Sequence, residues 1–145
     1  MDSDKSNRRD LVEKDVHKVR VMLVDDDPAF LKIVSTQLRT LQRNELEIVG
    51  VARSGEECII KAQALAPKIV LMDLHMPGRG GLWAIPLLQI IFPETHVIAL
   101  TSSDSENSRR AVLAAGANAL VSKSAWKKDL IPAIQRAVKK VDLNV

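Results

Sequence analysis

The feature that most limits how this chain can fold is the alternation of short apolar runs with longer segments of helical character. The runs are rich in β-branched and aliphatic residues, which is typical of strands buried on both faces of a parallel sheet. They are VRVMLVD at 19–25, LEIVGVA at 46–52, KIVLMD at 68–73, HVIALT at 96–101 and ALVS at 119–122. Five such alternations predict an α/β fold, a doubly wound five-stranded parallel sheet with helices on both faces.

Helix signals follow each predicted strand. Pro28 suits a first helical turn, and Ser54 with Glu57 is a capping-box pair. Ser105 or Asn107 near the start and Gly116 at the end delimit another helix. The predicted helices therefore cover about 28–41, 54–66, 82–91, 105–116 and 126–140. We expect Pro86 to bend the third helix or to delay its regular part.

Composition fits one globular domain. Hydrophobic residues make up 46% of the 145 residues, enough for a full core. The longest apolar stretch, LWAIPLLQIIF, is too short and too interrupted for membrane insertion. The single cysteine, Cys58, excludes an intramolecular disulfide and is expected in the core. No secretory signal is visible, so we expect a cytoplasmic protein. We expect a polar tail at 1–18, the domain at 19–140, and a C-terminal tail or the start of a linker at 141–145.

Polar side chains follow four of the predicted strands where each strand ends. Asp25, Asp26 and Asp27 follow the first, and Asp73 ends the third. Thr101 ends the fourth, and Lys123 follows the fifth. Because ligands of open parallel sheets bind at the carboxyl ends of the strands, these groups are expected to converge on one rim.

Such a rim can hold a divalent cation and a phosphoryl group. Clustered carboxylates are ligands for Mg²⁺, which prefers one or two of them together with waters and a phosphoryl oxygen. An ammonium and a hydroxyl beside them would stabilise the incoming phosphoryl charge. A carboxylate can also be the nucleophile and form an aspartyl-phosphate.

The segments LVDDDP, MDLHMPGRGG, ALTSS and SKSA resemble the receiver domain of bacterial two-component response regulators over about residues 19 to 140. The resemblance implies a flavodoxin-like strand order 2-1-3-4-5. It also implies Asp73 as the phosphoacceptor, with Thr101 as the mobile hydroxyl and Lys123 as the lysine that contacts the phosphoryl group. Mg²⁺ would be bound by Asp25, Asp26, Asp73 and the backbone carbonyl of His75. Such a receiver is a signalling protein and not a conventional enzyme, because it catalyses only its own phosphoryl transfer and dephosphorylation.

The segments DLHMPG and GANALVSK are most similar to those of receivers of transcriptional regulators with a helix-turn-helix domain. The implied partners are a sensor histidine kinase or phosphotransfer protein, and a homodimer through the surface of 105–116, 119–122 and 126–140. DNA would be contacted only through an output domain, which nothing in this chain could form. The candidate residues on the output surface are Leu120, Arg109, Arg110, Trp126, Lys127 and Lys128.

Two alternatives stay open at this point. Leu120 stands where the family usually has an aromatic switch residue, which weakly favours a receiver-like interaction module that works without phosphorylation. A haloacid-dehalogenase-type phosphohydrolase would use Asp25 as nucleophile and Asp27 as general acid. Ala29 and the lack of an acidic pair after Lys123 argue against that second alternative.

Overall fold

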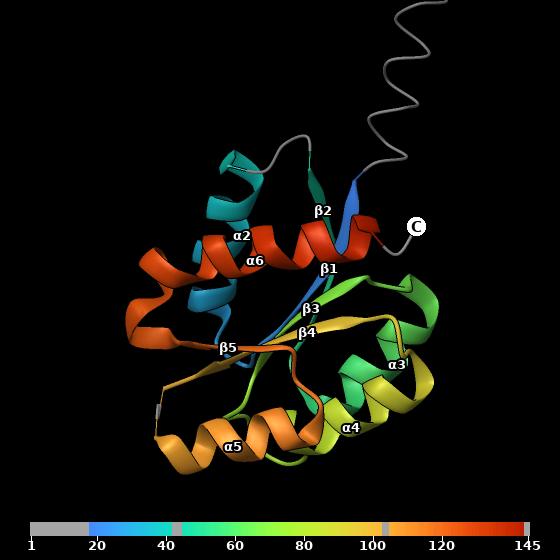
Figure 1. The fold of residues 1–145 in the computed structure, drawn as a ribbon, viewed down its shortest axis with the longest axis vertical. Helices are drawn as coiled ribbons and strands as arrows, with labels where there is room; N and C mark the ends of the chain where they lie inside the picture. Colours follow the sequence, from blue (N-terminus) through green and yellow to red (C-terminus); the bar gives the residue numbers. More distant parts are fainter. Residues whose placement is uncertain (1–17, 42–44, 103–104, 144–145) are drawn as a thin grey trace, which may run out of the picture.

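The five predicted strands form one parallel sheet in the computed structural model, which describes residues 18–41, 45–102 and 105–143 (Figure 1). The strands are β1 (Val19–Val24), β2 (Leu46–Ala52), β3 (Ile69–Asp73), β4 (His96–Thr101) and β5 (Ala119–Ser122). Their order in the sheet is β2-β1-β3-β4-β5. Both the doubly wound architecture and the flavodoxin-like strand order are therefore confirmed.

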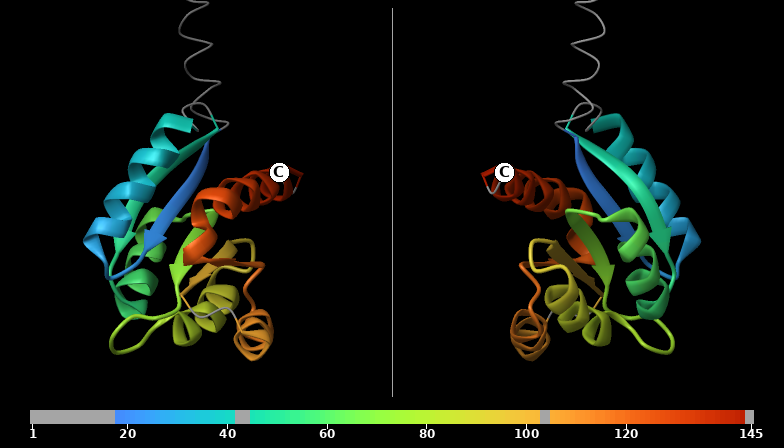
Figure 2. Two further views of the ribbon diagram at one scale, coloured as in Figure 1. Left: turned by 90° about the vertical axis from the view of Figure 1, so that its left-hand side faces the viewer. Right: turned by 90° about the vertical axis from the view of Figure 1, so that its right-hand side faces the viewer.

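Helices cover both faces of this sheet. Figures 1 and 2 show α2 (Pro28–Leu41) and α6 (Trp126–Leu143) on one face, and α3 (Gly55–Leu65), α4 (Gly81–Ile91) and α5 (Glu106–Ala115) on the other. A short 3-10 helix, η1 (Lys123–Ala125), joins β5 directly to α6. The predicted polar tail lies outside the described residues except for Lys18.

The alternation of side chains along the strands separates two cores. Val21 and Leu23 of β1 point into a core with α2 and α6, whereas Met22 and Val24 point into a core with α3, α4 and α5. Cys58 belongs to the second core and is fully buried, as expected. Each face of the sheet thus has its own set of apolar contacts.

The helix ends follow local chemistry. Ser54 caps α3 by accepting the Glu57 amide at 3.1 Å, as predicted. Glu57 reaches back to the Arg53 amide, one residue before the position of an ideal capping box. Ser105 and Gly116 cap α5 at its two ends, as the sequence indicated.

Two helix boundaries differ from the expectation. The predicted delay of α4 is wrong, because the helix begins at Gly81 and runs through Pro86 without interruption, while the alternative, a bend at Pro86, stays a prediction. Proline removes one amide donor there, and the burial of Ala84, Ile85 and Leu88 holds the helix in place. Helix α6 extends to Leu143, three residues beyond the predicted end, because its buried face continues to Val141.

No helix in the described part of the chain is both long and apolar enough to cross a membrane.

Candidate functional site

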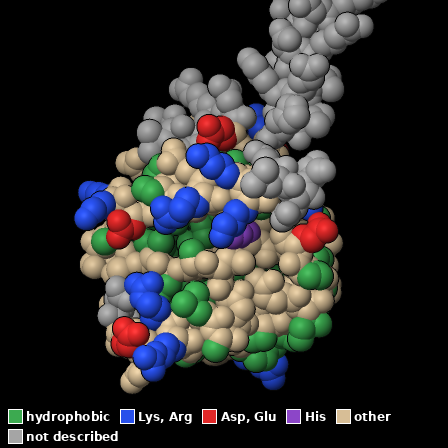
Figure 3. Space-filling view, viewed as in Figure 1, with side chains coloured by type: hydrophobic (Ala, Val, Ile, Leu, Met, Phe, Trp, Pro, Cys, Tyr) green, Lys and Arg blue, Asp and Glu red, His purple; other side chains and the backbone are tan. Residues whose placement is uncertain are grey.

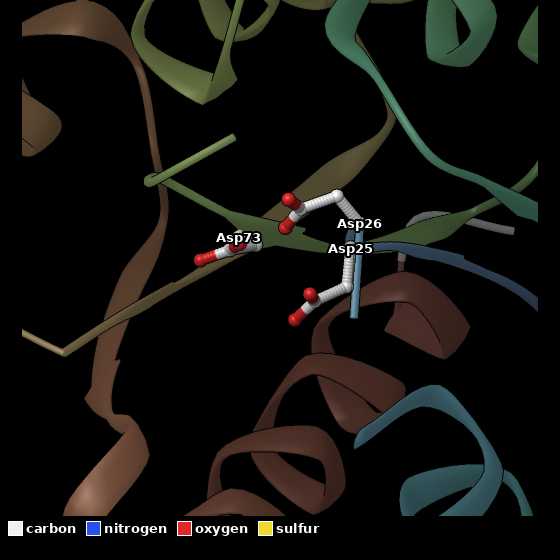
Figure 4. Close-up of side chains that lie close together, drawn as sticks. All are labelled: Asp25, Asp26 and Asp73. Carbon is white, nitrogen blue, oxygen red and sulfur yellow. The ribbon is translucent and has the colours of Figure 1, made fainter. Parts of the chain in front are cut away.

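Three carboxylates meet where β1 and β3 end side by side. Val24 is paired with Met72 in the parallel register, so Asp25 and Asp73 leave neighbouring strands at the same level. Carboxylate oxygens of Asp25, Asp26 and Asp73 lie within 4.8 Å of one another (Figure 4). Asp25 and Asp73 are only 2% and 1% exposed, while Asp26 is open to solvent. The predicted convergence of these acids is therefore observed.

Lys123 brings a positive charge into this cluster from the first residue of η1. Its Nζ lies 2.7 Å from Asp25 Oδ2 and 3.4 Å from Asp73 Oδ1. Burial by itself lowers the pKa of the ammonium, but the contact with Asp25 and the charge of Asp73 outweigh that effect and raise the pKa of Lys123. Lys123 is thus a cation at neutral pH and bridges two strand ends.

Asp73 is destabilised as an anion by its surroundings. Burial raises the pKa of the Asp73 carboxyl, the His75 amide lowers it through a 3.2 Å hydrogen bond to Oδ1, and the charge of Asp25 raises it again. Lys123 lowers it further but does not cancel the rise. The net upward shift means that an added positive charge would stabilise the ionised site.

Asp25 has an incomplete set of partners. Its Oδ1 accepts the Asp27 amide at 2.9 Å. Its Oδ2 is buried and has no aligned hydrogen bond, so the Lys123 ammonium is its charge partner among the described residues. A buried carboxylate oxygen of this kind, beside two further carboxylates, has the hard oxygen chemistry that Mg²⁺ requires. The residues present therefore fit a divalent cation.

Asp27 does not join the cluster. Its Oδ1 accepts the Ala29 amide at 3.0 Å, and its carbonyl accepts the Leu31 amide, so Asp27 caps α2. This capping contact engages one oxygen of the carboxylate that the phosphohydrolase alternative would use as its general acid.

Thr101 lies buried at the end of β4 and faces a side chain that the sequence did not connect with it. The Thr101 hydroxyl is 3.0 Å from Nε2 of His75, an exposed residue beyond the end of β3. The predicted metal-binding role of the His75 backbone carbonyl stays a prediction. The ring contact shows a second link between the β3 and β4 ends.

Phe30 is a neighbour of the site that sequence reasoning missed. The Lys123 ammonium lies 4.6 Å from the centroid of the Phe30 ring. That ring in turn meets Trp126 edge to face, with centroids 5.9 Å apart. The only sequence signal was the position of Phe30 in the first turn of α2, shortly after the acidic run.

The loop after Asp73 is fixed by two close backbone approaches. The Gly55 amide donates to the Arg79 carbonyl at 2.8 Å, and a Cβ at Gly55 would lie 2.5 Å from that oxygen. A Cβ at Gly81 would lie 2.8 Å from the Asp73 carbonyl oxygen. Only glycine allows these contacts, so the loop that carries His75 is held against the start of α3 and α4.

The predicted output-surface residues separate into two groups. Arg109 and Arg110 on α5 and Lys127 and Lys128 on α6 are exposed. Leu120 and Trp126 are half-buried and pack against the two different cores. Figure 3 shows several Lys and Arg side chains on this face of the molecule.

The fold and the site together define a doubly wound α/β protein with an acidic cluster, a lysine and a threonine at the carboxyl ends of its strands. A family model described as "Response regulator receiver domain" matches residues 21–135. The chain belongs to this family. The motif-based resemblance and the signalling class that it implied are therefore confirmed.

Its relatives are bacterial response regulators. The chain is 36% identical over 117 residues to response regulator GacA of Pseudomonas protegens, which covers 81% of this chain and 54% of GacA. It is 31% identical over 118 residues to response regulator protein VraR of Staphylococcus aureus, covering 81% of this chain and 56% of VraR. The chain thus spans about half the length of these relatives.

Solved structures agree with this assignment. The receiver domain of the putative response regulator NarL from Mycobacterium tuberculosis superimposes with a TM-score of 0.77 at 26% identity, covering 85% of this chain and 98% of that one. A LuxR-family two-component response regulator from Aurantimonas sp. SI85-9A1 gives 0.76 at 27% identity, covering 85% and 86%.

Proposed function

We propose that this receiver accepts a phosphoryl group on Asp73 from a sensor histidine kinase or phosphotransfer protein, in a Mg²⁺-dependent reaction. The observation that supports this most directly is the position of Lys123 between Asp25 and Asp73, at 2.7 and 3.4 Å. A lysine at that place holds a positive charge beside the acceptor carboxylate before any phosphoryl group arrives. Lys123 is not simply one partner of a surface ion pair, because both Asp25 and Asp73 are buried.

The transfer forms one bond and breaks one. An Asp73 oxygen attacks phosphorus, the bond from phosphorus to the donor histidine nitrogen breaks, and an acyl phosphate results. Asp73 Oδ1 is engaged by the His75 amide and Lys123, whereas Oδ2 accepts no hydrogen bond from the described residues. We therefore assign Oδ2 as the attacking atom, with Oδ1 as the oxygen that fixes the orientation of the carboxylate.

Four groups would hold the metal ion: the carboxylates of Asp25, Asp26 and Asp73, and the backbone carbonyl of His75. A bound Mg²⁺ would supply positive charge for the oxygens of the phosphoryl group. Asp25 Oδ2 has the Lys123 ammonium, 2.7 Å away, as its charge partner among the described residues, and Asp26 is exposed and accessible. Asp25 and Asp73 are held in place by amide hydrogen bonds, which keeps the donor set organised.

Lys123 and Thr101 would receive the charge of the phosphoryl group. Lys123 is already in contact with Asp73 and can turn toward a new anion without leaving the site. Thr101 lies at the next strand end, where its hydroxyl could exchange the His75 ring for a phosphoryl oxygen. Water would later hydrolyse the acyl phosphate and return Asp73 to its free carboxylate.

The decisive experiment is phosphorylation with a small phosphodonor, acetyl phosphate, in the presence of Mg²⁺, followed by intact-protein mass spectrometry. We expect one added phosphoryl group, and none in Asp73→Asn or after chelation of Mg²⁺. Asp27→Asn is the matched control and should be labelled normally. Labelling that persists in Asp73→Asn but disappears in Asp25→Asn would overturn the assignment of the acceptor.

We further propose that the phosphorylated state is read at the surface of α5, β5 and α6, by a partner or by a second copy of the chain. Support comes from the exposed cations of this surface (Figure 3); Lys127 and Lys128 form no ion pair with the described residues. Lys127→Glu with Lys128→Glu should weaken association while Asp73 is still phosphorylated. The matched control is Lys139→Glu with Lys140→Glu at the far end of α6. Unchanged sedimentation and pull-down of the first double variant would contradict this output surface.

The relatives suggest the wider setting. GacA and VraR are response regulators about twice the matched length, and one structural neighbour is of the LuxR family. We propose that this receiver controls transcription through an output domain, which would provide any contact with DNA. A cytoplasmic location follows from that role and stays a prediction.

A further inference from the structure

We infer that Phe30 is a positioning residue for Lys123 and couples the place of its ammonium to Trp126 at the start of α6. The inference rests on the proposed phosphorylation of Asp73. It describes how phosphorylation of Asp73 can change the packing of the protein although Leu120 stands at the position where the family usually has an aromatic switch residue.

The resting position of Lys123 is fixed from three sides. Nζ lies 2.7 Å from Asp25 Oδ2, 3.4 Å from Asp73 Oδ1 and 4.6 Å from the centroid of Phe30. The negative face of an aromatic ring attracts a cation at this distance, most strongly where water is partly excluded. Phe30 therefore stabilises the ammonium in the place where it pairs with Asp25.

The same ring is in contact with the beginning of α6. Phe30 and Trp126 meet edge to face at 5.9 Å and 78°, an arrangement in which the two rings attract one another. Trp126 is also joined to Lys123 through the chain, since η1 spans only Lys123–Ala125 and the Trp126 amide donates to the Lys123 carbonyl. Lys123, Phe30 and Trp126 are thus linked through one ring and one short backbone segment, so we expect movement of the lysine away from Phe30 to change the surroundings of Trp126.

Leu120 contacts the core on the opposite face of the sheet from Phe30 and Trp126. Its side chain is half-buried against the core of α3, α4 and α5, whereas Phe30 and Trp126 pack on the core of α2 and α6. A phosphoryl group on Asp73 would draw the Lys123 ammonium toward a new anion and away from the ring. This packing change would therefore fall on the α2 and α6 side of the sheet.

Tryptophan emission can test the resting contact without any phosphoryl donor. Trp83 lies under Arg79 beside the loop after Asp73, so Trp83→Phe leaves Trp126 as the sole emitter. In that background we expect Lys123→Met to shift the emission, and we expect the shift to vanish when Phe30→Leu is added. In a double-mutant cycle, the combined effect of Lys123→Met and Phe30→Leu on the unfolding equilibrium constant should depart from additivity by about two- to fivefold. Additive changes in both quantities would overturn the inference.

A second measurement tests the active state. Acetyl phosphate with Mg²⁺ is added, phosphoryl occupancy of Asp73 is read by mass spectrometry, and emission is compared at equal occupancy. We expect the change in Trp126 emission to be lost in Phe30→Leu, retained in the control Phe92→Leu at the end of α4, and restored by Phe30→Tyr, which keeps a ring. An undiminished change in Phe30→Leu would overturn the inference. Absence of any phosphoryl group on the unmutated protein would instead contradict the proposed function, and the double-mutant cycle would still decide the role of Phe30.

Discussion

Replacing Asp26 by Asn should stabilise the metal-free protein and remove most of its response to Mg²⁺. The three acids lie within 4.8 Å of one another, and only Asp25 and Asp73 are in contact with Lys123. Asp26 is therefore the acid of the cluster whose charge is least compensated. Its replacement removes repulsion while the hydrogen bonds that hold Asp25 and Asp73 remain.

The size of the effect follows from distance and solvent. Two unit charges 4.8 Å apart repel by about 3.5 kcal/mol at an effective dielectric of 20 and by about 0.9 kcal/mol in water. Asp26 is exposed, so the value for water applies, and Lys123 offsets one of its two acidic neighbours. We expect a gain of about 1 kcal/mol, which for a domain of this size raises the melting temperature by about 3 to 4 °C.

Thermal melts across a Mg²⁺ titration measure both parts of this prediction. The unmutated protein should gain about 2.7 kcal/mol at a hundredfold excess of metal over its dissociation constant, and Asp26→Asn should gain little. Asp27→Asn is the matched control: it also removes one exposed carboxylate, but Asn caps α2 equally well through the Ala29 amide. If Asp26→Asn melts lower without metal and keeps the full Mg²⁺ response, the three carboxylates are not a shared metal site.

Three further outcomes follow from the same geometry. Lys123→Met should lower the free energy of unfolding in chelator by about 2 kcal/mol or more, because two buried acids lose their cation, and an unchanged urea midpoint would contradict this. Asp73→Asn should stabilise the protein at neutral pH: the folded-state pKa of Asp73 is raised, so the ionised carboxyl destabilises the fold in full above that pKa. Urea melts at decreasing pH should show this gain shrinking as the pH falls through the raised pKa toward the ordinary value of 3.8, and a gain that does not change with pH would be the wrong result. Burial raises the pKa of Cys58 to about 12, so thiol reagents should label it only as fast as the protein unfolds, and rapid labelling of the native protein would contradict its place in the core.

The fold could be predicted from the sequence because its signals are local. A strand buried on both faces needs a continuous apolar run, and a helix end needs a capping side chain, so both are visible along the chain. The delay expected from Pro86 does not occur, since the cost of one lost amide donor depends on how strongly the helix is packed against its sheet. The end of α6 was placed too early because the polar residues before Val141 gave no sign that the buried face continues.

The composition of the site was predictable, but its internal contacts were not. Strand order and a common rim bring Asp25, Asp73, Thr101 and Lys123 together whatever their rotamers. The pairing of Lys123 with Asp25, by contrast, depends on the side-chain conformations that the folded neighbours allow. The contacts of Phe30 with Lys123 and of His75 with Thr101 join residues far apart in the sequence, and no local pattern indicates them.

The close approach of Gly55 to the loop carrying His75 has a consequence for comparative genomics. A side chain at this position would collide with the Arg79 carbonyl, 2.5 Å from an added Cβ, although Gly55 belongs to α3 and not to the segment around Asp73. In an alignment of receivers, the residue at this position therefore carries information about the path of a loop more than twenty positions downstream. Chains with a larger residue there should show compensating insertions, deletions or substitutions between Leu74 and Gly80, so the two segments are expected to covary across lineages.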